Sequence, residues 1–511
     1  MDLQPQVVVE VPLKRSPFPL LILALLSLGL AKGGAPRRRS EPHDWLQFAS
    51  PVLEGRRGQR NPISASNASR LATLWRVPLA EQCDGSPVYV SSVLTKRGFV
   101  DLLISSTTRG RVIALDADRG TLVWQTTPPE GPRWTTSSPA VDPKKEFVFA
   151  YGLDGYVHKY ALENGKEIIG DGWPELITLK GDVEKGSSNI AIATAQNGST
   201  YLYMTTSAYP DPGDDGDYQG HLVTIDIDTG RQNVFNALCS DRPIHFRNTG
   251  DKFDCGDLQA GIWARLGATY DPVTDRIFVT TGNGGFNAHT GGFNWGSSVV
   301  ALRPDGSTDD GTPLDSYTPA DYQRITDEDL DLSSSGIVPL PTLPSSPFSR
   351  LGVQAGKDWR IRLLNLEDLS GTGRPRAVGG ELQLLQVWQG GEVKSQPAAW
   401  FDRATRKTWV FVANREGISA LQLAARADDS PHLVEKWLTL NDGGTTPIVA
   451  NGVLFVASPH NIVALKPTTG AVLWRDTTIG DIHWQSPIVV NGTLFIADNA
   501  GYMSAYSLNG Q

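Results

Sequence analysis

Short apolar runs alternate with turns rich in glycine, aspartate and asparagine along most of the chain, and no long stretch shows the period of an amphipathic helix. Residues 112–115 form one such run, Val-Ile-Ala-Leu, whose β-branched side chains are typical of a buried strand. The turn that follows contains Asp116, which can hydrogen-bond the backbone two residues on, and Gly120, which can adopt a positive φ. Residues 121–124 resume the strand pattern and end in a tryptophan, a large packing anchor.

This strand–turn–strand phrase returns along the chain. Residues 114–124 (ALDADRGTLVW) come back as residues 464–474 (ALKPTTGAVLW), with weaker echoes at 161–165, 225–230 and 301–306. A unit that recurs in this way cannot bury its apolar face alone, so its neighbours must stack against it. The pattern therefore indicates a repeat protein.

Turn signals divide the chain into eight units, and the last of them lacks an outer strand. Residues 71–75 would supply that strand and close the ring, which leaves only short, protected sheet edges. We predict an all-β fold, an eight-bladed β-propeller closed by pairing of N- and C-terminal strands; an open β-solenoid or two β-sandwiches are the alternatives. The units run approximately over residues 86–124, 136–168, 190–235, 263–306, 335–371, 396–437, 444–474 and 484–510.

Composition and the N-terminal sequence bear on the partners and the location of the protein. The chain is 40% hydrophobic and 20% charged, as a globular protein should be, and its net charge of −9 argues against a nucleic-acid partner. A short apolar run at residues 20–31 follows two basic residues and ends in small residues, as a secretory signal does. The run is too short for a stable membrane span, although a short membrane anchor is the alternative.

We therefore expect a signal peptide over residues 1–31, a polar linker over 32–69, the propeller over 70–511, and a periplasmic or extracellular location. Three cysteines are too few for a disulfide scaffold. Cys239 and Cys255 bracket a polar loop and could form one bridge in an oxidising compartment, or both could be reduced thiols.

Acidic residues crowd two loops in and after the longest units, at residues 211–217 and 327–331. Carboxylates with flexible glycines are what a hard cation such as Ca²⁺ needs, whereas a solvated acidic loop is the commoner structure for either cluster alone.

A more specific likeness lies in the fourth unit. Residues 270–272 (Tyr-Asp-Pro), 281–284 (Thr-Gly-Asn-Gly) and 297–302 (Ser-Ser-Val-Val-Ala-Leu) follow one another much as in the quinoprotein alcohol dehydrogenases. The chain resembles that family over residues 70–511, or from residue 44 if an opening Trp-x-x-Phe phrase is included. Those enzymes are eight-bladed propellers that carry pyrroloquinoline quinone (PQQ) and Ca²⁺. Propellers that bind no quinone share the blade phrase, including a lipoprotein of the outer-membrane assembly machinery.

The resemblance implies a set of site residues. Asn283 matches the asparagine that ligates Ca²⁺ in the family, and Asp215 is the nearest counterpart of a glutamate ligand from an earlier blade. The catalytic aspartate of the family lies in a segment before the fifth blade, where Asp329 and Asp331 are the two candidates.

Two further residues would contact the quinone. Lys357 matches a basic residue in a turn that ends in glycine in the family, but here Trp359 stands in place of the glycine. Trp263 resembles the tryptophan that stacks under the quinone, although a tryptophan at this position could equally be a blade-packing residue.

These likenesses imply a PQQ- and Ca²⁺-dependent oxidoreductase that acts on an alcohol or sugar-type substrate and passes electrons to an acceptor. Ca²⁺ would polarise the quinone, and an aspartate would take the alcohol proton.

The chain departs from the family in having no adjacent cysteine pair and at best an aspartate where a glutamate ligand is expected. A quinone-free propeller that serves as a binding or envelope-assembly scaffold, and a propeller with a purely structural Ca²⁺ site, are the alternatives. An enzyme requires Asp215, Asn283 and Asp329 or Asp331 to converge at one end of the central channel.

Overall fold

The structure is a computed structural model that describes residues 43–49, 62–131, 133–209, 218–242, 255, 257–341, 343 and 346–511. Contacts divide the chain into the units Met1–Glu41 and Pro42–Gln511, and the described residues all belong to the second unit. The expected signal peptide lies outside the described residues. None of the helices in the described part of the chain is both long and apolar enough to cross a bilayer.

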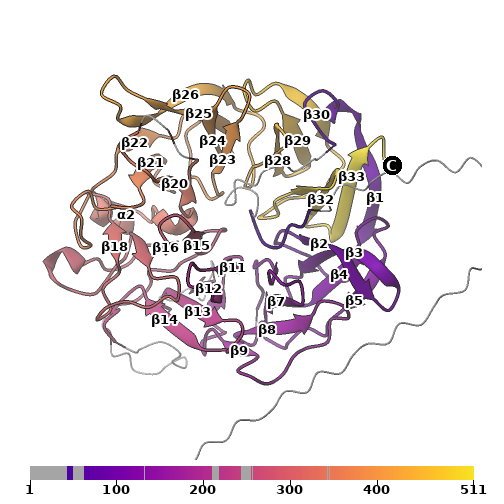
Figure 1. The fold of residues 1–511 in the computed structure, drawn as a ribbon, viewed down its shortest axis with the longest axis horizontal. Helices are drawn as coiled ribbons and strands as arrows, with labels where there is room; N and C mark the ends of the chain where they lie inside the picture. Colours follow the sequence, from indigo (N-terminus) through magenta and orange to yellow (C-terminus); the bar gives the residue numbers. More distant parts are fainter. Residues whose placement is uncertain are drawn as a thin grey trace, which may run out of the picture. The chain divides into compact units, whose positions relative to one another are not determined.

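Eight antiparallel sheets follow one another around a ring, which confirms the predicted eight-bladed β-propeller (Figure 1). The described chain is nearly all β structure, with a single α-helical turn, α2 (Tyr322–Asp327), and three short 3₁₀ segments, η1 (Ala68–Arg70), η2 (Ala288–Thr290) and η3 (Leu332–Ser334). The first two blades comprise β2 (Val88–Thr95), β3 (Gly98–Ser106), β4 (Val112–Asp116) and β5 (Leu122–Gln125), then β6 (Ala140–Val141), β7 (Phe147–Tyr151), β8 (Tyr156–Ala161) and β9 (Glu175–Leu176).

The third blade has five strands because β10 and β11 both pair with β12. Its strands are β10 (Glu184–Gly186), β11 (Ala191–Thr194), β12 (Thr200–Ala208), β13 (His221–Asp226) and β14 (Gln232–Asn236). The fourth and fifth blades comprise β15 (Thr269–Asp271), β16 (Arg276–Thr280), β17 (Val299–Leu302) and β18 (Asp315–Tyr317), then β19 (Val338–Pro339), β20 (Leu351–Ala355), β21 (Arg360–Asn365) and β22 (Gln383–Gln386).

The last three blades close the ring. The sixth and seventh comprise β23 (Ala398–Asp402), β24 (Lys407–Ala413), β25 (Ile418–Ala425) and β26 (Pro431–Thr439), then β27 (Ile448–Ala450), β28 (Val453–Ser458), β29 (Asn461–Leu465) and β30 (Val472–Asp476). The eighth combines β31 (Ile488–Val490), β32 (Thr493–Ala497) and β33 (Tyr502–Leu508) with β1 (Leu71–Pro78) from the start of the propeller. β1 pairs antiparallel with β33, with Leu71 opposite Leu508, so the predicted closure is confirmed (Figure 1).

The repeated phrase has a physical explanation in the contacts between blades. Trp124, at the end of β5, packs over Gly165 in a turn of the next blade and donates a hydrogen bond from Nε1 to the carbonyl oxygen of Leu162 at 3.0 Å. Gly165 has a φ of 71°, and a Cβ there would collide with the tryptophan ring, so both backbone and space require glycine. The same pairing joins two other blade pairs, through Trp75 over Gly120 and Trp437 over Gly470.

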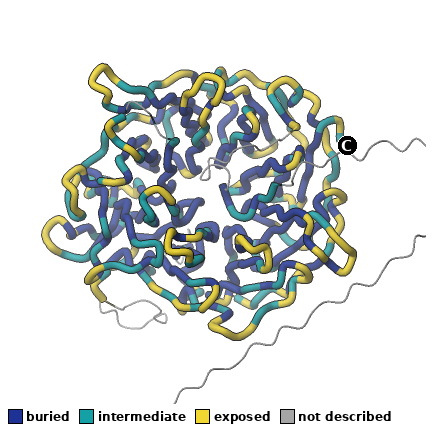
Figure 2. Tube along the Cα trace, viewed as in Figure 1, coloured by how far each residue is buried: buried dark blue, intermediate teal, exposed yellow. Residues whose placement is uncertain are grey.

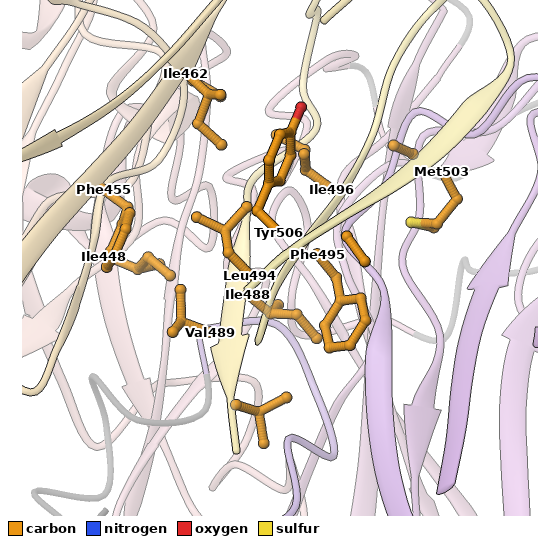
Figure 3. Packing of buried hydrophobic residues seen from close by; sticks show 14 of the residues in the cluster. Ile448, Phe455, Ile462, Ile488, Val489, Leu494, Phe495, Ile496, Met503 and Tyr506 are labelled. Carbon is orange, nitrogen blue, oxygen red and sulfur yellow. The ribbon is translucent and has the colours of Figure 1, made fainter. Parts of the chain in front are cut away.

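Buried residues concentrate in the strands of the blades, and exposed residues concentrate in the connecting turns (Figure 2). Between the seventh and eighth blades, Phe455 and Ile462 lie in one cluster with Leu494 and Phe495 (Figure 3). Residues 43–49 fall within the stretch predicted as a polar linker, yet Trp45 is buried there and exchanges two 2.8 Å backbone hydrogen bonds with Tyr89 of β2. Its indole ring packs in a cluster of buried apolar side chains, whereas the side chains of a polar linker stay in solvent.

Candidate functional site

One cavity of about 590 Å³ brings together every predicted site residue that the structure describes. Its walls come from the second, third, fourth, fifth and eighth blades, so the cavity lies where the blades converge. Asp215 lies outside the described residues, and its predicted role stays a prediction. The predicted residues in the cavity wall are Trp263, Asn283, Asp329, Asp331 and Lys357.

Four of these residues form a closed ring of hydrogen bonds, called here the carboxylate ring: Asn283, Asp329, Asp331 and Lys357. Asp331 accepts the backbone N–H of Asn283 at 2.9 Å through Oδ1 and lies 3.1 Å from Lys357 Nζ through Oδ2. Asp329 accepts the side-chain amide of Asn283 at 2.8 Å and also lies 3.1 Å from Lys357 Nζ. Residues from two blades and the connection between them are thereby fixed together.

Local contacts explain the residue types of the Thr-Gly-Asn phrase at residues 281–283. Gly282 lies so close to Asp331 that an added Cβ would be 2.6 Å from Oδ1. Thr281 accepts the backbone N–H of Ser298 at 2.9 Å through its hydroxyl oxygen and donates its own backbone N–H to the carbonyl oxygen of Ser298 at 2.8 Å. The threonine thus ties the loop to the start of the neighbouring strand, and the glycine lets the asparagine approach the aspartate.

Lys357 stands in the turn between β20 and β21, and a buried ion pair holds that turn. Asp358 pairs with Arg362, which is fully buried and also donates to Tyr317 Oη at 3.1 Å. Trp359 adopts a φ of 64°, the left-handed conformation that glycine reaches without steric cost. The sequence departs from the family at this position, whereas the backbone takes the conformation that glycine favours.

The two candidate aspartates differ in exposure. The side chain of Asp331 is 14% exposed and that of Asp329 is 78% exposed. Burial disfavours the charged form of Lys357, but the nearby carboxylates of Asp331 and Asp329 outweigh this effect and raise the pKa of the ammonium group. Lys357 therefore stays charged at neutral pH, Asp331 anchors it, and Asp329 is the carboxylate that a ligand can reach.

One atom of the ring has no partner. Asn283 Oδ1 is buried and accepts no hydrogen bond, although the side-chain nitrogen of the same residue is bound. An amide oxygen beside carboxylates belongs to the donor set of a hard cation such as Ca²⁺, so Asn283 and Asp329 fit such an ion. Within the described ranges, no three acidic, histidine or cysteine side chains gather as metal ligands.

Trp263 is half-buried in the cavity wall, and Lys357 Nζ lies 5.9 Å from its ring centroid. An aromatic face so placed can stack against a planar ligand that also receives a hydrogen bond from the lysine. A second cavity, of about 890 Å³, adjoins the first and shares Lys394, His483 and Trp484 with it. Trp359 lines this larger cavity and is 51% exposed.

Sequence reasoning named Lys357 but missed two other basic residues of the cavity. Lys185 and Arg265, called here the cation pair, line the same wall as Trp134, Tyr209 and Trp484. Neither cation belongs to a repeated phrase or to a family motif, so only the three-dimensional arrangement identifies them.

The cysteine alternatives are resolved by the structure. Cys239 and Cys255 form a disulfide bridge with Cα atoms 5.8 Å apart, and Cys83 is buried and unbridged. Cys255 packs in a small apolar cluster with Ala260, which donates its backbone N–H to the carbonyl oxygen of Asn283 at 2.6 Å. The bridge therefore supports the loop that carries Asn283.

Comparison with known proteins extends this picture. A family model described as glucose/ethanol/alcohol dehydrogenase, beta-propeller domain, matches residues 45–308, about half of the chain. A second model, described as outer membrane protein assembly factor BamB, matches residues 398–511. The chain is 24% identical over 405 residues to the quinohemoprotein alcohol dehydrogenase ADH IIB of Pseudomonas putida, which covers 72% of this chain and 55% of that relative. The chain spans about half the length of the curated relatives it matches.

Two solved structures share the fold over most of the chain. The quinohemoprotein alcohol dehydrogenase of Comamonas testosteroni superposes with a TM-score of 0.63 at 15% identity, covering 92% of this chain and 81% of that chain. A europium-containing methanol dehydrogenase gives the same TM-score and identity, covering 92% of this chain and 98% of that chain.

Proposed function

The chain belongs to the glucose/ethanol/alcohol dehydrogenase β-propeller family, and on that premise we propose that it is a PQQ-dependent oxidoreductase that oxidises an alcohol or sugar-type substrate. The observation that carries the proposal is the carboxylate ring beside Trp263 in one cavity. The ring offers a proton acceptor, a fixed cation and an unpartnered amide oxygen within reach of one planar ligand.

Each residue has a role in this proposal. When bound, PQQ supplies the two-electron oxidant and Ca²⁺ the Lewis acid. Trp263 would stack against the ligand plane, Lys357 would donate a hydrogen bond to it, and Asn283 Oδ1 would contribute to cation binding.

The two aspartates have different roles, one as a proton acceptor and the other as a positioning residue. Asp329, the exposed carboxylate, takes the hydroxyl proton of the substrate as the carbon–hydrogen bond is oxidised. Asp331 keeps the lysine and the asparagine loop in position. The residues of the cavity would thus orient both the substrate and the bound ligand.

The disulfide bridge supports the location that goes with this function. Bridges of this kind persist in oxidising compartments, in agreement with the proposed export to the periplasm or the cell exterior.

A second candidate rests on the match of residues 398–511 to the BamB family model. Under this alternative, the protein is a quinone-free scaffold that binds another protein, as an envelope-assembly factor would. The two candidates differ in one measurable property, the binding of a quinone in the cavity.

The test is a calorimetric titration of the full chain with PQQ, in Ca²⁺ and in a chelator, followed by absorbance. We expect Ca²⁺-dependent binding that Asn283→Ala weakens by at least about 10-fold, because a metal-bound ligand atom is lost. Asn233→Ala is the matched control, since that asparagine lies on the outer strand β14 and its side-chain amide donates to the carbonyl oxygen of Asp305, away from the cavity. Absence of binding at micromolar quinone would contradict the proposal and favour the scaffold.

A further inference from the structure

Within the part of the chain that the structure describes, the cation pair has no acidic partner. The side chain of Lys185 lies with Nζ 3.4 Å from the ring centroid of Trp134 and 5.1 Å from that of Tyr209. Arg265 is 3% exposed and Lys185 is 4% exposed. Across the described residues, no carboxylate oxygen lies within ion-pair distance of either cation.

The guanidinium group of Arg265 is only partly satisfied. It donates to the carbonyl oxygens of Thr136 at 2.8 Å and Ser187 at 3.5 Å, whereas its Nε is buried without a partner. The nearest acidic influence is Asp84, and its carboxylate is already bound to His483 Nδ1 at 2.7 Å and to a backbone N–H. The arginine therefore keeps a donor that nothing in the described chain uses.

The burial of two positive charges without a carboxylate beside them disfavours the folded state. Burial and the charge of Arg265 lower the pKa of Lys185 to about 7, and burial lowers the pKa of Arg265 to about 10. The aromatic faces around Lys185 offset only part of the cost of burying an unpaired charge. Such a pair is retained where a ligand completes it.

We propose that Lys185 and Arg265 form an anion subsite that binds a carboxylate group of a planar ligand held in this cavity. The planar shape follows from the indole rings of Trp134, Trp263 and Trp484 in the same wall, and the charge follows from the two cations. The carboxylate belongs either to the quinone, in which case the inference rests on the proposed function, or to a substrate acid. Either source presents the same chemistry to the cation pair.

The test compares PQQ with its trimethyl ester, which keeps the ring system and has no carboxylate. We expect the wild-type protein to bind the acid about 10- to 100-fold more tightly than the ester, because charge-assisted hydrogen bonds are lost with the ester. Lys185→Met and Arg265→Met should reduce affinity for the acid toward that for the ester. Lys159→Met is the matched control, since Lys159 lies over Phe147 in the second blade and lines neither cavity.

A second arm separates this inference from the proposed function. Phthalate, a planar dicarboxylate, should raise the melting temperature of the wild-type protein and of Lys159→Met but not of Lys185→Met. Phthalate binding at pH 8 should also take up protons, because an anion beside Lys185 favours its charged form; calorimetry in two buffers of different ionisation enthalpy measures this uptake.

The outcomes are distinct. If PQQ fails to bind but phthalate protects the wild-type protein through Lys185, the subsite stands and the cofactor assignment fails. If acid and ester bind equally and phthalate neither stabilises the wild-type protein nor causes proton uptake, the anion subsite is overturned.

Discussion

The carboxylate ring and the cation pair occupy the same cavity, but only in the ring does the fold itself supply carboxylates that pair with the buried cation. In the ring, Lys357 has carboxylate oxygens of two aspartates at 3.1 Å, and each aspartate also accepts a hydrogen bond from Asn283. In the pair, Lys185 and Arg265 have aromatic rings and carbonyl oxygens around them, and none of the described carboxylates pairs with them. A buried charge that the fold itself neutralises supports the structure, whereas one that the fold leaves unpaired indicates a ligand.

The largest expected effect comes from breaking the ring. Asp331→Ala removes the acceptor of the Asn283 backbone N–H and one of the two partners of Lys357, so we expect a loss of about 3 kcal/mol in the free energy of unfolding. Urea denaturation measures this loss. Asp309→Ala is the control, because its ion pair with Arg303 is exposed and contributes about 0–1 kcal/mol. Equal losses in both variants would show that the ring does not stabilise the fold.

Removing one charge of the cation pair is expected to raise the free energy of unfolding, whereas breaking the ring lowers it. Lys185→Met removes an unpaired buried charge and keeps the volume of the side chain, so the protein should gain about 1–2 kcal/mol of stability at pH 6. This gain depends on pH, because the pKa of Lys185 is about 7 in the folded protein and 10.5 in an unperturbed lysine.

Between these two values the unfolded wild-type chain binds more protons than the folded one, so wild-type stability rises with pH, by up to about 1.4 kcal/mol per unit. Arg265 and Arg133 strengthen the effect and Asp84 weakens it. The advantage of Lys185→Met should therefore shrink from pH 7 to pH 9, and a constant advantage across this range would show that Lys185 is not titrating there.

The fold was predictable because its determinants are local and repeated. Trp124 and Gly165 belong to the same recurring phrase that appears in several blades, so each contact between blades leaves a visible trace in the sequence. The ring closure followed from one missing strand, which the pairing of Leu71 with Leu508 supplies.

The four members of the carboxylate ring were named as candidates for a different reason, the resemblance of short phrases to a known family, and their roles stay predictions. Asn283 stands in a short phrase whose glycine and threonine are required by the geometry, and Asp331 lies directly before the next unit. No sequence motif identified the cation pair. Lys185 lies in a three-residue strand of ordinary composition, and its burial depends on Trp134 and Tyr209, which lie far from it in sequence and close in space.

The smallest effect is expected at Trp359, in the turn that presents Lys357 to the ring. A non-glycine residue in the left-handed region costs about 1–2 kcal/mol, and glycine costs about 0.5–1 kcal/mol through the entropy of the unfolded chain. Because the side chain is 51% exposed and loses little burial, Trp359→Gly should change the free energy of unfolding by less than about 1 kcal/mol.

Trp388→Gly is the matched comparison for this last variant. Trp388 is 41% exposed but does not have a positive φ, so glycine brings the entropic cost there without relieving any strain. Urea denaturation should find Trp388→Gly less stable than Trp359→Gly. If the order is reversed, the Trp359 side chain itself stabilises the turn. The position of Lys357 in the carboxylate ring then depends on Trp359, a residue outside the ring.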